Sequence, residues 1–196
     1  MNKRAQLLHA VATFLIGMGF GVSAWAQEIG IMQSSLTSAK AGEKPGLYLS
    51  LSVEFDLPRA VKDALLRGIA LYFVTDFVLE KTRWYWMDQP QSETSLVTRL
   101  SYSPLTRQYR VSRGGLSQSF DTLKSALDAI KIITDWRVSD KTHISTPKDF
   151  EAEVRFRLDT QQLPLPMQVS IGNNDWDLSS DWHSIVLDNR VSSSEE

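Results

Sequence analysis

A stretch of alternating apolar residues constrains the fold of this chain more than any other feature. From Leu47 to Phe55 every second residue is Leu, Val or Phe, and the residues between them are Tyr, Ser or Glu. Side chains of a β-strand point alternately to the two faces of a sheet, so this stretch would place its apolar side chains on one face. It predicts a strand buried on one side, and therefore a second layer that covers that side.

Two helices are predicted between such strands. Asp56 and Pro58 mark the start of the first helix, because Pro is favoured in the first turn, and Gly68 fits its end. The second helix follows Phe120 and has an apolar residue at every third or fourth position. Asp121 or Ser119 is its expected N-terminal cap.

The run from Ile69 to Glu80 is rich in β-branched and aromatic residues, which favours a strand from Thr75 onward. Its first part, through Phe73, fits a helix as well as a strand, and the sequence leaves residues 69–74 open between the two. Other strands are predicted at 83–87, 96–102, 107–113, 116–120, 136–138, 150–158, 168–171 and 175–187. We therefore expect a mainly β (α+β) protein: an antiparallel β sandwich of about nine strands with two inserted helices.

The first 26 residues resemble a secretory signal peptide. Lys3 and Arg4 precede an apolar segment from residue 7 to 22, and Ala24 and Ala26 form a small-x-small cleavage site. Cleavage would leave the protein in the periplasm or secreted. The alternative is that residues 7–24 stay attached and anchor the chain in the inner membrane, since such a run approaches the length that spans a bilayer.

After this segment we expect residues 27–46 to be flexible or an edge strand. Residues 47–190 would form one β-rich domain, and 191–196 a disordered tail.

Charge and cysteine content exclude several classes of function. Without Lys3 and Arg4, 19 basic residues stand against 23 acidic ones, and no basic cluster is present, so nucleic acid is not an expected partner. The chain would meet a membrane only through an uncleaved signal segment. The absence of cysteine excludes disulfides, thiolate catalysis and a lipid-modified cysteine. We expect no cofactor.

Histidine is the usual base at neutral pH, and His143 and His183 remain after the signal segment. His143 lies in a polar connector typical of a surface loop. Asp181 and His183 are two residues apart and would share one face of a strand, which makes them weak candidates for a catalytic pair. No G-x-S-x-G motif supplies a serine nucleophile. A hydrolase that uses Asp181 and His183 is therefore an alternative only.

A calcium loop is not supported by the acidic segment before His183. Asn173, Asp175 and Asp177 have the spacing of the first three ligands, but Leu178 replaces the required Gly and Ser184 the bidentate Glu. Asn and Asp also favour turns, because they tolerate left-handed backbone and bond to it. We expect a turn here and no metal site.

Aromatic residues provide the candidate binding surface. Arg83, Trp84, Tyr85 and Trp86 would place aromatic rings on both faces of one strand, so that one face would either be exposed or cover a helix. Exposed tryptophan rings could stack on sugars, which gives a carbohydrate-binding module as a further alternative. Tryptophan is nevertheless buried in most proteins.

The segment from Asp175 to His183 is the second part of that surface. Its alternation predicts a closing strand with two different faces. The inward face would consist of Trp176, Leu178, Ser180 and Trp182, and the outward face of Asp177, Ser179, Asp181 and His183.

The chain resembles a family of exported proteobacterial proteins, found mainly in beta-proteobacteria, that carry a domain of unknown function. The resemblance rests on a series of motifs: Gly46 to Ser50, Glu54 to Pro58, Val61 to Phe73, Arg83 to Trp86, Leu100 to Tyr102, Thr106 to Val111, Phe120 to Ala129, Leu163 to Met167 and Trp176 to Trp182. It implies no catalytic residue or ligand. Members of that family often neighbour a membrane sensor kinase and its response regulator, which implies an accessory role in envelope signalling.

The expected function is that of an exported, non-enzymatic β sandwich that binds a protein or another component of the cell envelope. The expected binding residues are Arg83, Trp84, Tyr85, Trp86, Asp177, Asp181 and His183.

Overall fold

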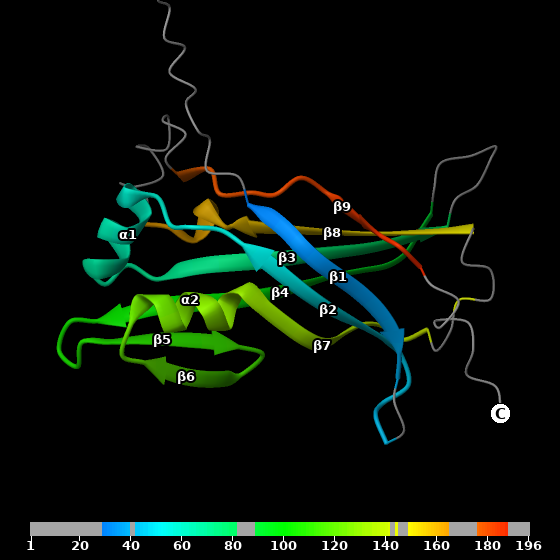
Figure 1. Cartoon of the computed structure of the whole chain (residues 1–196), viewed down its shortest axis with the longest axis horizontal. Helices are drawn as coiled ribbons and strands as arrows, with labels where there is room; N and C mark the ends of the chain where they lie inside the picture. The colour runs from blue at the N-terminus through cyan, green and yellow to red at the C-terminus, as the bar shows by residue number, and fades with distance from the viewer. Residues whose placement is uncertain are drawn as a thin grey trace, which may run out of the picture.

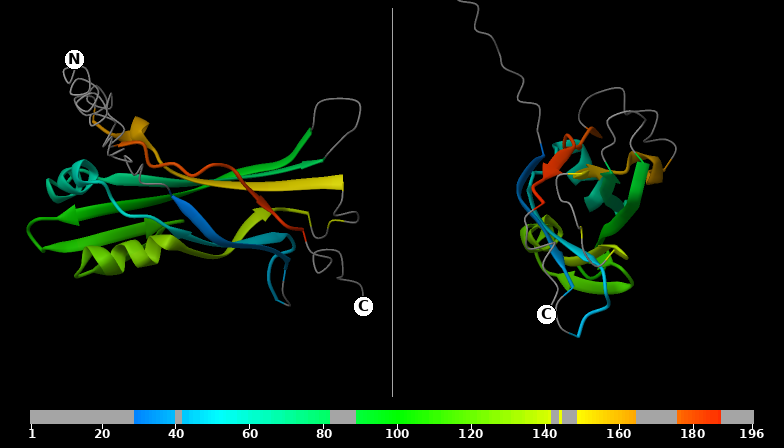
Figure 2. Two further views of the ribbon diagram at one scale, coloured as in Figure 1. Left: turned by 45° about the horizontal axis from the view of Figure 1, so that its top comes forward. Right: turned by 90° about the vertical axis from the view of Figure 1, so that its right-hand side faces the viewer.

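The structure is a computed structural model that describes residues 29–39, 42–81, 89–141, 144, 149–164 and 176–187, with 89–91 described by their backbone alone. Two antiparallel sheets form its two layers, and the smaller sheet lies obliquely across the larger one (Figure 1). The end-on view shows the two layers and the space between them that the core side chains fill (Figure 2). The prediction of an antiparallel β sandwich with two helices is confirmed.

The smaller sheet has three strands in the order β1-β2-β7, where β1 is Gly30–Ser38, β2 Leu47–Glu54 and β7 Ile132–Ser139. The larger sheet has six strands in the order β6-β5-β4-β3-β8-β9. These are β6 Leu116–Phe120, β5 Gln108–Arg113, β4 Gln89–Ser103, β3 Leu71–Lys81, β8 Phe150–Leu158 and β9 His183–Ile185. A short 3-10 helix, η2, spans Thr160–Gln162 after β8.

The core lies between the sheets and is built from the apolar face of β2. The alternating residues of this strand are buried as the sequence predicts, and the ring of Phe55 follows them into the core. Its centroid lies 5.4 Å from that of Phe73 on β3 and 5.3 Å from that of Phe156 on β8. Because β2 belongs to one sheet and β3 and β8 to the other, this aromatic cluster joins the two layers.

Helix α1 (Arg59–Leu66) follows Pro58, which stands at the position before its first residue. Gly68 ends the helix in the left-handed conformation, with φ +88°. Its N–H donates to Leu65 O and the N–H of Ile69 to Ala64 O, which is the hydrogen-bond pattern of a Schellman motif. The segment that the sequence leaves open is therefore no continuation of the helix, and the strand β3 begins at Leu71.

Helix α2 (Leu123–Lys131) occupies its predicted place, but its predicted cap is wrong. Thr122 caps it, because this residue has an extended backbone and its Oγ1 accepts a hydrogen bond from the N–H of Ser125 at 3.1 Å. Asp121 accepts a hydrogen bond from the Gln108 side chain instead, and Ser119 lies within β6. Both helices lie toward the same end of the sandwich (Figures 1 and 2).

Within the described part of the chain, neither helix has the length and apolar character needed to cross a membrane.

Candidate functional site

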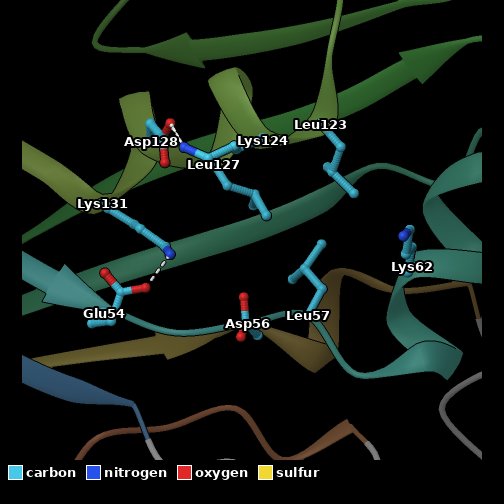
Figure 3. Close-up of a pocket in the computed structure, with 9 residues that line it drawn as sticks. All are labelled: Glu54, Asp56, Leu57, Lys62, Leu123, Lys124, Leu127, Asp128 and Lys131. Carbon is cyan, nitrogen blue, oxygen red and sulfur yellow. Dashed lines mark hydrogen bonds and ion pairs between the residues drawn. The ribbon is translucent and has the colours of Figure 1, made fainter.

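A cleft of about 630 Å³ opens between α2 and the segment that joins β2 to α1 (Figure 3). It lies where the helices leave the edge of the core uncovered. Its walls are formed by Glu54, Asp56, Leu57, Lys62, Leu123, Lys124, Leu127, Asp128 and Lys131. The cleft therefore has contributions from β2, α1 and α2, which the fold brings together from distant parts of the sequence.

Three leucines form the apolar floor of the cleft. Leu123 and Leu127 are four residues apart on α2 and so lie on the same face of that helix. Leu57 approaches from the opposite wall, and its side chain points toward that of Leu127 (Figure 3). Leu57 and Leu123 are only partly buried against the core, so they offer apolar surface to a ligand.

An ion pair fixes the width of the cleft at one end. Nζ of Lys131, in the last turn of α2, donates to Oε1 of Glu54 at the end of β2. The same ammonium group lies 5.4 Å from the centroid of the Phe55 ring, which attracts the cation through its π face. The Lys131 side chain is only 14% exposed, so this contact holds α2 against the smaller sheet.

Charges of both signs surround the floor. Lys124 donates a hydrogen bond of 2.8 Å to Oδ2 of Asp128 one turn later on α2. This hydrogen bond and the negative charge of Asp128 raise the pKa of Lys124, which therefore stays protonated at neutral pH. Asp56 and Lys62 supply one further charge of each sign on the opposite wall. The rim as a whole is close to neutral.

The described lining of the cleft consists of leucines, lysines and carboxylates. None of its nine described lining residues is a histidine, serine, threonine or tyrosine, so no side chain there resembles a neutral-pH base paired with a nucleophile. The described residues also contain no group of three or more acidic or histidine side chains that could hold a metal ion. An apolar floor inside a charged rim instead matches the usual form of a recognition site.

A polar cluster lies on the outer face of the larger sheet, away from the core. Asp76 of β3 accepts hydrogen bonds from Arg157 Nε at 2.8 Å, Arg155 Nη2 at 3.1 Å and Ser95 Oγ at 2.8 Å. Partial burial acts to raise the pKa of Asp76, but these hydrogen bonds together lower it below its ordinary value. The ring of Trp182 covers Arg155, whose Cζ lies 4.6 Å from the ring centroid. This cluster ties β3, β4, β8 and the C-terminal segment together.

Several of the predicted site residues lie outside the described residues. These are Arg83, Trp84, Tyr85 and Trp86, together with His143, Asn173 and Asp175.

Asp177, Asp181 and His183 are described, and all three are exposed. His183 opens β9 and pairs with Val154 of β8, at an edge of the larger sheet. No hydrogen bond or ion pair joins its side chain to Asp181, although both residues are in the described part of the chain. Neither lines the cleft. The structure thus places the two residues at the sheet edge without joining them.

The predicted alternation of the C-terminal segment is correct up to Ser180 and wrong for Trp182. Trp176, Leu178 and Ser180 are buried, whereas Trp182 is 40% exposed and lies on the outer face over Arg155. Ser179 pairs with Arg157 and His183 with Val154, so four steps along this segment oppose three along β8. This segment therefore has one residue more than β8 between the two pairings, and an extra residue reverses the side-chain alternation beyond it.

The cleft could not be recognised in the sequence, since Glu54 and Lys131 are 77 residues apart and the residues next to each of them form no distinctive motif. The sequence does mark Asp76 as an unusual residue. It is an acid within the apolar run that became β3, at a position on the less buried face.

No curated protein and no solved structure matches this chain. A family model, described as Domain of unknown function (DUF4390), matches residues 26–186. The match covers the whole sandwich, including both walls of the cleft. The chain therefore belongs to the DUF4390 family.

Proposed function

We propose that this chain is an exported, non-enzymatic binding protein whose cleft holds a segment of another polypeptide of the cell envelope. The observation that carries the proposal is the composition of the cleft: three leucine side chains on the floor, with acidic and basic side chains on both walls.

This composition favours a polypeptide over other ligand classes. A site for nucleic acid or phosphate would carry an excess of positive charge, whereas the cleft has three lysines and three acids. The acyl chain of a lipid would need a longer apolar lining than the three leucines of the cleft. A polypeptide segment offers apolar side chains for the floor, and its amides and charged groups can meet both kinds of charge on the rim.

Export is supported by the N-terminal sequence. Residues 1–26 carry the charge, the apolar run and the cleavage site of a signal peptide, and their removal would release the sandwich outside the cytoplasm. The alternative that residues 7–24 remain as an inner-membrane anchor would leave the cleft in the same compartment. An accessory role in envelope signalling, which the family resemblance implies, would make the ligand the exported part of a membrane sensor.

The alternatives gain less support from the described residues. A hydrolase would need a nucleophile next to His183, which instead stands exposed at a sheet edge. A carbohydrate platform needs coplanar exposed rings, and among the described tryptophans Trp182 alone is strongly exposed while its ring covers Arg155.

The proposal is tested by affinity capture from an envelope extract with the mature chain, residues 27–196, as bait. Leu123→Asp places a charge on the floor of the cleft, and Leu105→Asp is the matched control because Leu105 is 97% exposed in the turn after β4. Circular dichroism checks that both variants fold.

We expect one polypeptide to be retained by the wild type and by Leu105→Asp, and lost with Leu123→Asp. Binding of the identified polypeptide is then measured by calorimetry with purified proteins. Equal retention by all three baits, or by none, would contradict the proposal.

A further inference from the structure

Among the described residues, no strand pairs with the outer edge of β6, and this edge has the properties of a surface for self-association. We propose that a second copy of this chain pairs with it, β6 to β6, around a two-fold axis at Gln118. The inference concerns an edge separate from the cleft and does not depend on the proposed function.

Edge strands of natural sheets are usually blocked by a lysine, a proline, a bulge or a covering segment. The sequence of β6 is Leu-Ser-Gln-Ser-Phe, without charge or proline, and its pairing with β5 has no register shift. The other described edges differ. β1 contains a bulge between Ile31 and Gln33 and contacts β9. β9 has only three residues. In β7, the carbonyl oxygen of Val138 accepts a hydrogen bond from the Ser92 side chain of β4.

The turn before β6 determines which of its backbone groups are free. Gly114 and Gly115 have φ +55° and +85°, as in a two-residue type I′ hairpin, and Arg113 pairs with Leu116 across it. The pair that closes such a hairpin is hydrogen-bonded, and pairs alternate along an antiparallel ladder. Ser117 and Ser119 therefore direct their N–H and C=O groups away from β5, toward the free edge.

A two-fold axis at Gln118 satisfies these free groups. It places Ser117 opposite the partner's Ser119, and each of these pairs exchanges two backbone hydrogen bonds. Leu116 then lies opposite the partner's Phe120, so apolar side chains meet apolar ones and hydroxyls meet hydroxyls. Nothing in this register brings like charges together.

A hollow of about 380 Å³ beside β6 accepts a side chain of the second copy. Its walls include Val111, Phe120 and Ala129 of α2. Leu116 is 79% exposed in the single chain, which is unusual for a leucine in a strand. In the proposed register the partner's Leu116 lies next to Phe120, on the face of β6 that lines the hollow.

The pairing joins two six-stranded sheets into one continuous sheet. Because a two-fold axis perpendicular to a sheet keeps each face on its own side, both smaller sheets and both clefts lie on the same side of it. The dimer would thus present two clefts to the same partner or membrane face.

The test is sedimentation velocity of the mature chain, residues 27–196, over a range of concentrations. Gln118 faces the same residue of the second copy across the axis, so Gln118→Lys and Gln118→Glu each place like charges opposite one another. Thr106→Lys, in the exposed turn after β4, controls for added charge.

We expect a dimer for the wild type and for Thr106→Lys. Each Gln118 variant alone should dimerise at least about tenfold more weakly, since juxtaposed like charges are strongly unfavourable. A mixture of Gln118→Lys with Gln118→Glu should dimerise again. A wild type that stays monomeric, or Gln118 variants that dimerise as the wild type does, would overturn the proposal.

Discussion

At the scale of single residues, Asp76 has the densest set of interactions on the outer face of the larger sheet. Its carboxylate is 14% exposed and accepts hydrogen bonds from Arg155, Arg157 and Ser95, which come from the two strands on either side of it. Removing its charge takes the nearest carboxylate away from two half-buried guanidinium groups and leaves Arg157 only the more distant Asp159, at 4.0 Å. Weakening the pairing of half-buried charges is costly.

We therefore expect Asp76→Asn to lower the free energy of unfolding by about 2 kcal/mol. Urea denaturation at pH 7 measures this loss. Asp140→Asn is the control, because Asp140 is 90% exposed in its ion pair with Arg137, and a surface pair of this kind should contribute less than about 0.5 kcal/mol. Equal losses in the two variants would contradict the role given to Asp76.

The same carboxylate makes stability depend on pH. The pKa of Asp76 is lower in the folded chain than in the unfolded one, so its stabilising effect is complete above the unfolded value of about 4. That effect is lost as the pH falls through the folded pKa. Thermal melts between pH 7 and pH 2 should therefore show a shallower acid decline for Asp76→Asn than for the wild type. Parallel curves would count against this prediction.

At the scale of elements, Arg113 joins β5 to the end of α2. Its side chain donates to the carbonyl groups of Ala129, Ile130 and Ile132 at 3.0 to 3.3 Å, and to Thr98 Oγ1 at 2.9 Å. The last carbonyl groups of a helix have no partner within the helix, so a cation there satisfies them and compensates the helix dipole. Burial lowers the pKa of Arg113, which nevertheless stays charged at neutral pH.

Arg113→Met should keep the volume of the side chain, lose these hydrogen bonds and destabilise the fold by about 2 kcal/mol. Arg110→Met is the control on the same strand, because Arg110 is exposed on the opposite face. Urea denaturation of the two variants measures the difference. A loss of stability for Arg110→Met as large as that for Arg113→Met would contradict the capping role.

Gly46, just before β2, lies against the end of β7. A methyl group at this position would meet the carbonyl oxygen of Ser139 and the side chain of Arg137, both on β7 or at its end. We expect Gly46→Ala to destabilise the sandwich by about 2 kcal/mol, as overpacking against backbone usually does. Gly30→Ala should change stability by less than about 0.5 kcal/mol, because only Met32 Sδ lies near, at 3.6 Å. Equal melting temperatures for Gly46→Ala and Gly30→Ala would contradict this prediction.

At the scale of the whole molecule, the sequence predicts those parts whose pattern is local. β2 alternates because one side is buried, and α1 ends at Gly68 because glycine adopts the left-handed conformation there. Trp182 lies on the face opposite to the predicted one because one extra residue reverses the alternation, and the residue types carry no sign of it. The cleft could not be predicted, since Leu57 and Leu127 are 70 residues apart in the sequence and only the tertiary fold brings them together.

Binding of a polypeptide in the cleft between α2 and the β2–α1 segment can be tested in cells. The most direct measurement replaces Lys124, at the rim and 85% exposed, with a photo-cross-linking amino acid in the exported protein in cells. Leu105 carries the same group as a control.

We expect a cross-link from position 124 to one envelope polypeptide, absent from position 105 and abolished by Leu123→Asp in the same chain. A cross-link that forms equally from both positions, or that survives Leu123→Asp, would contradict it.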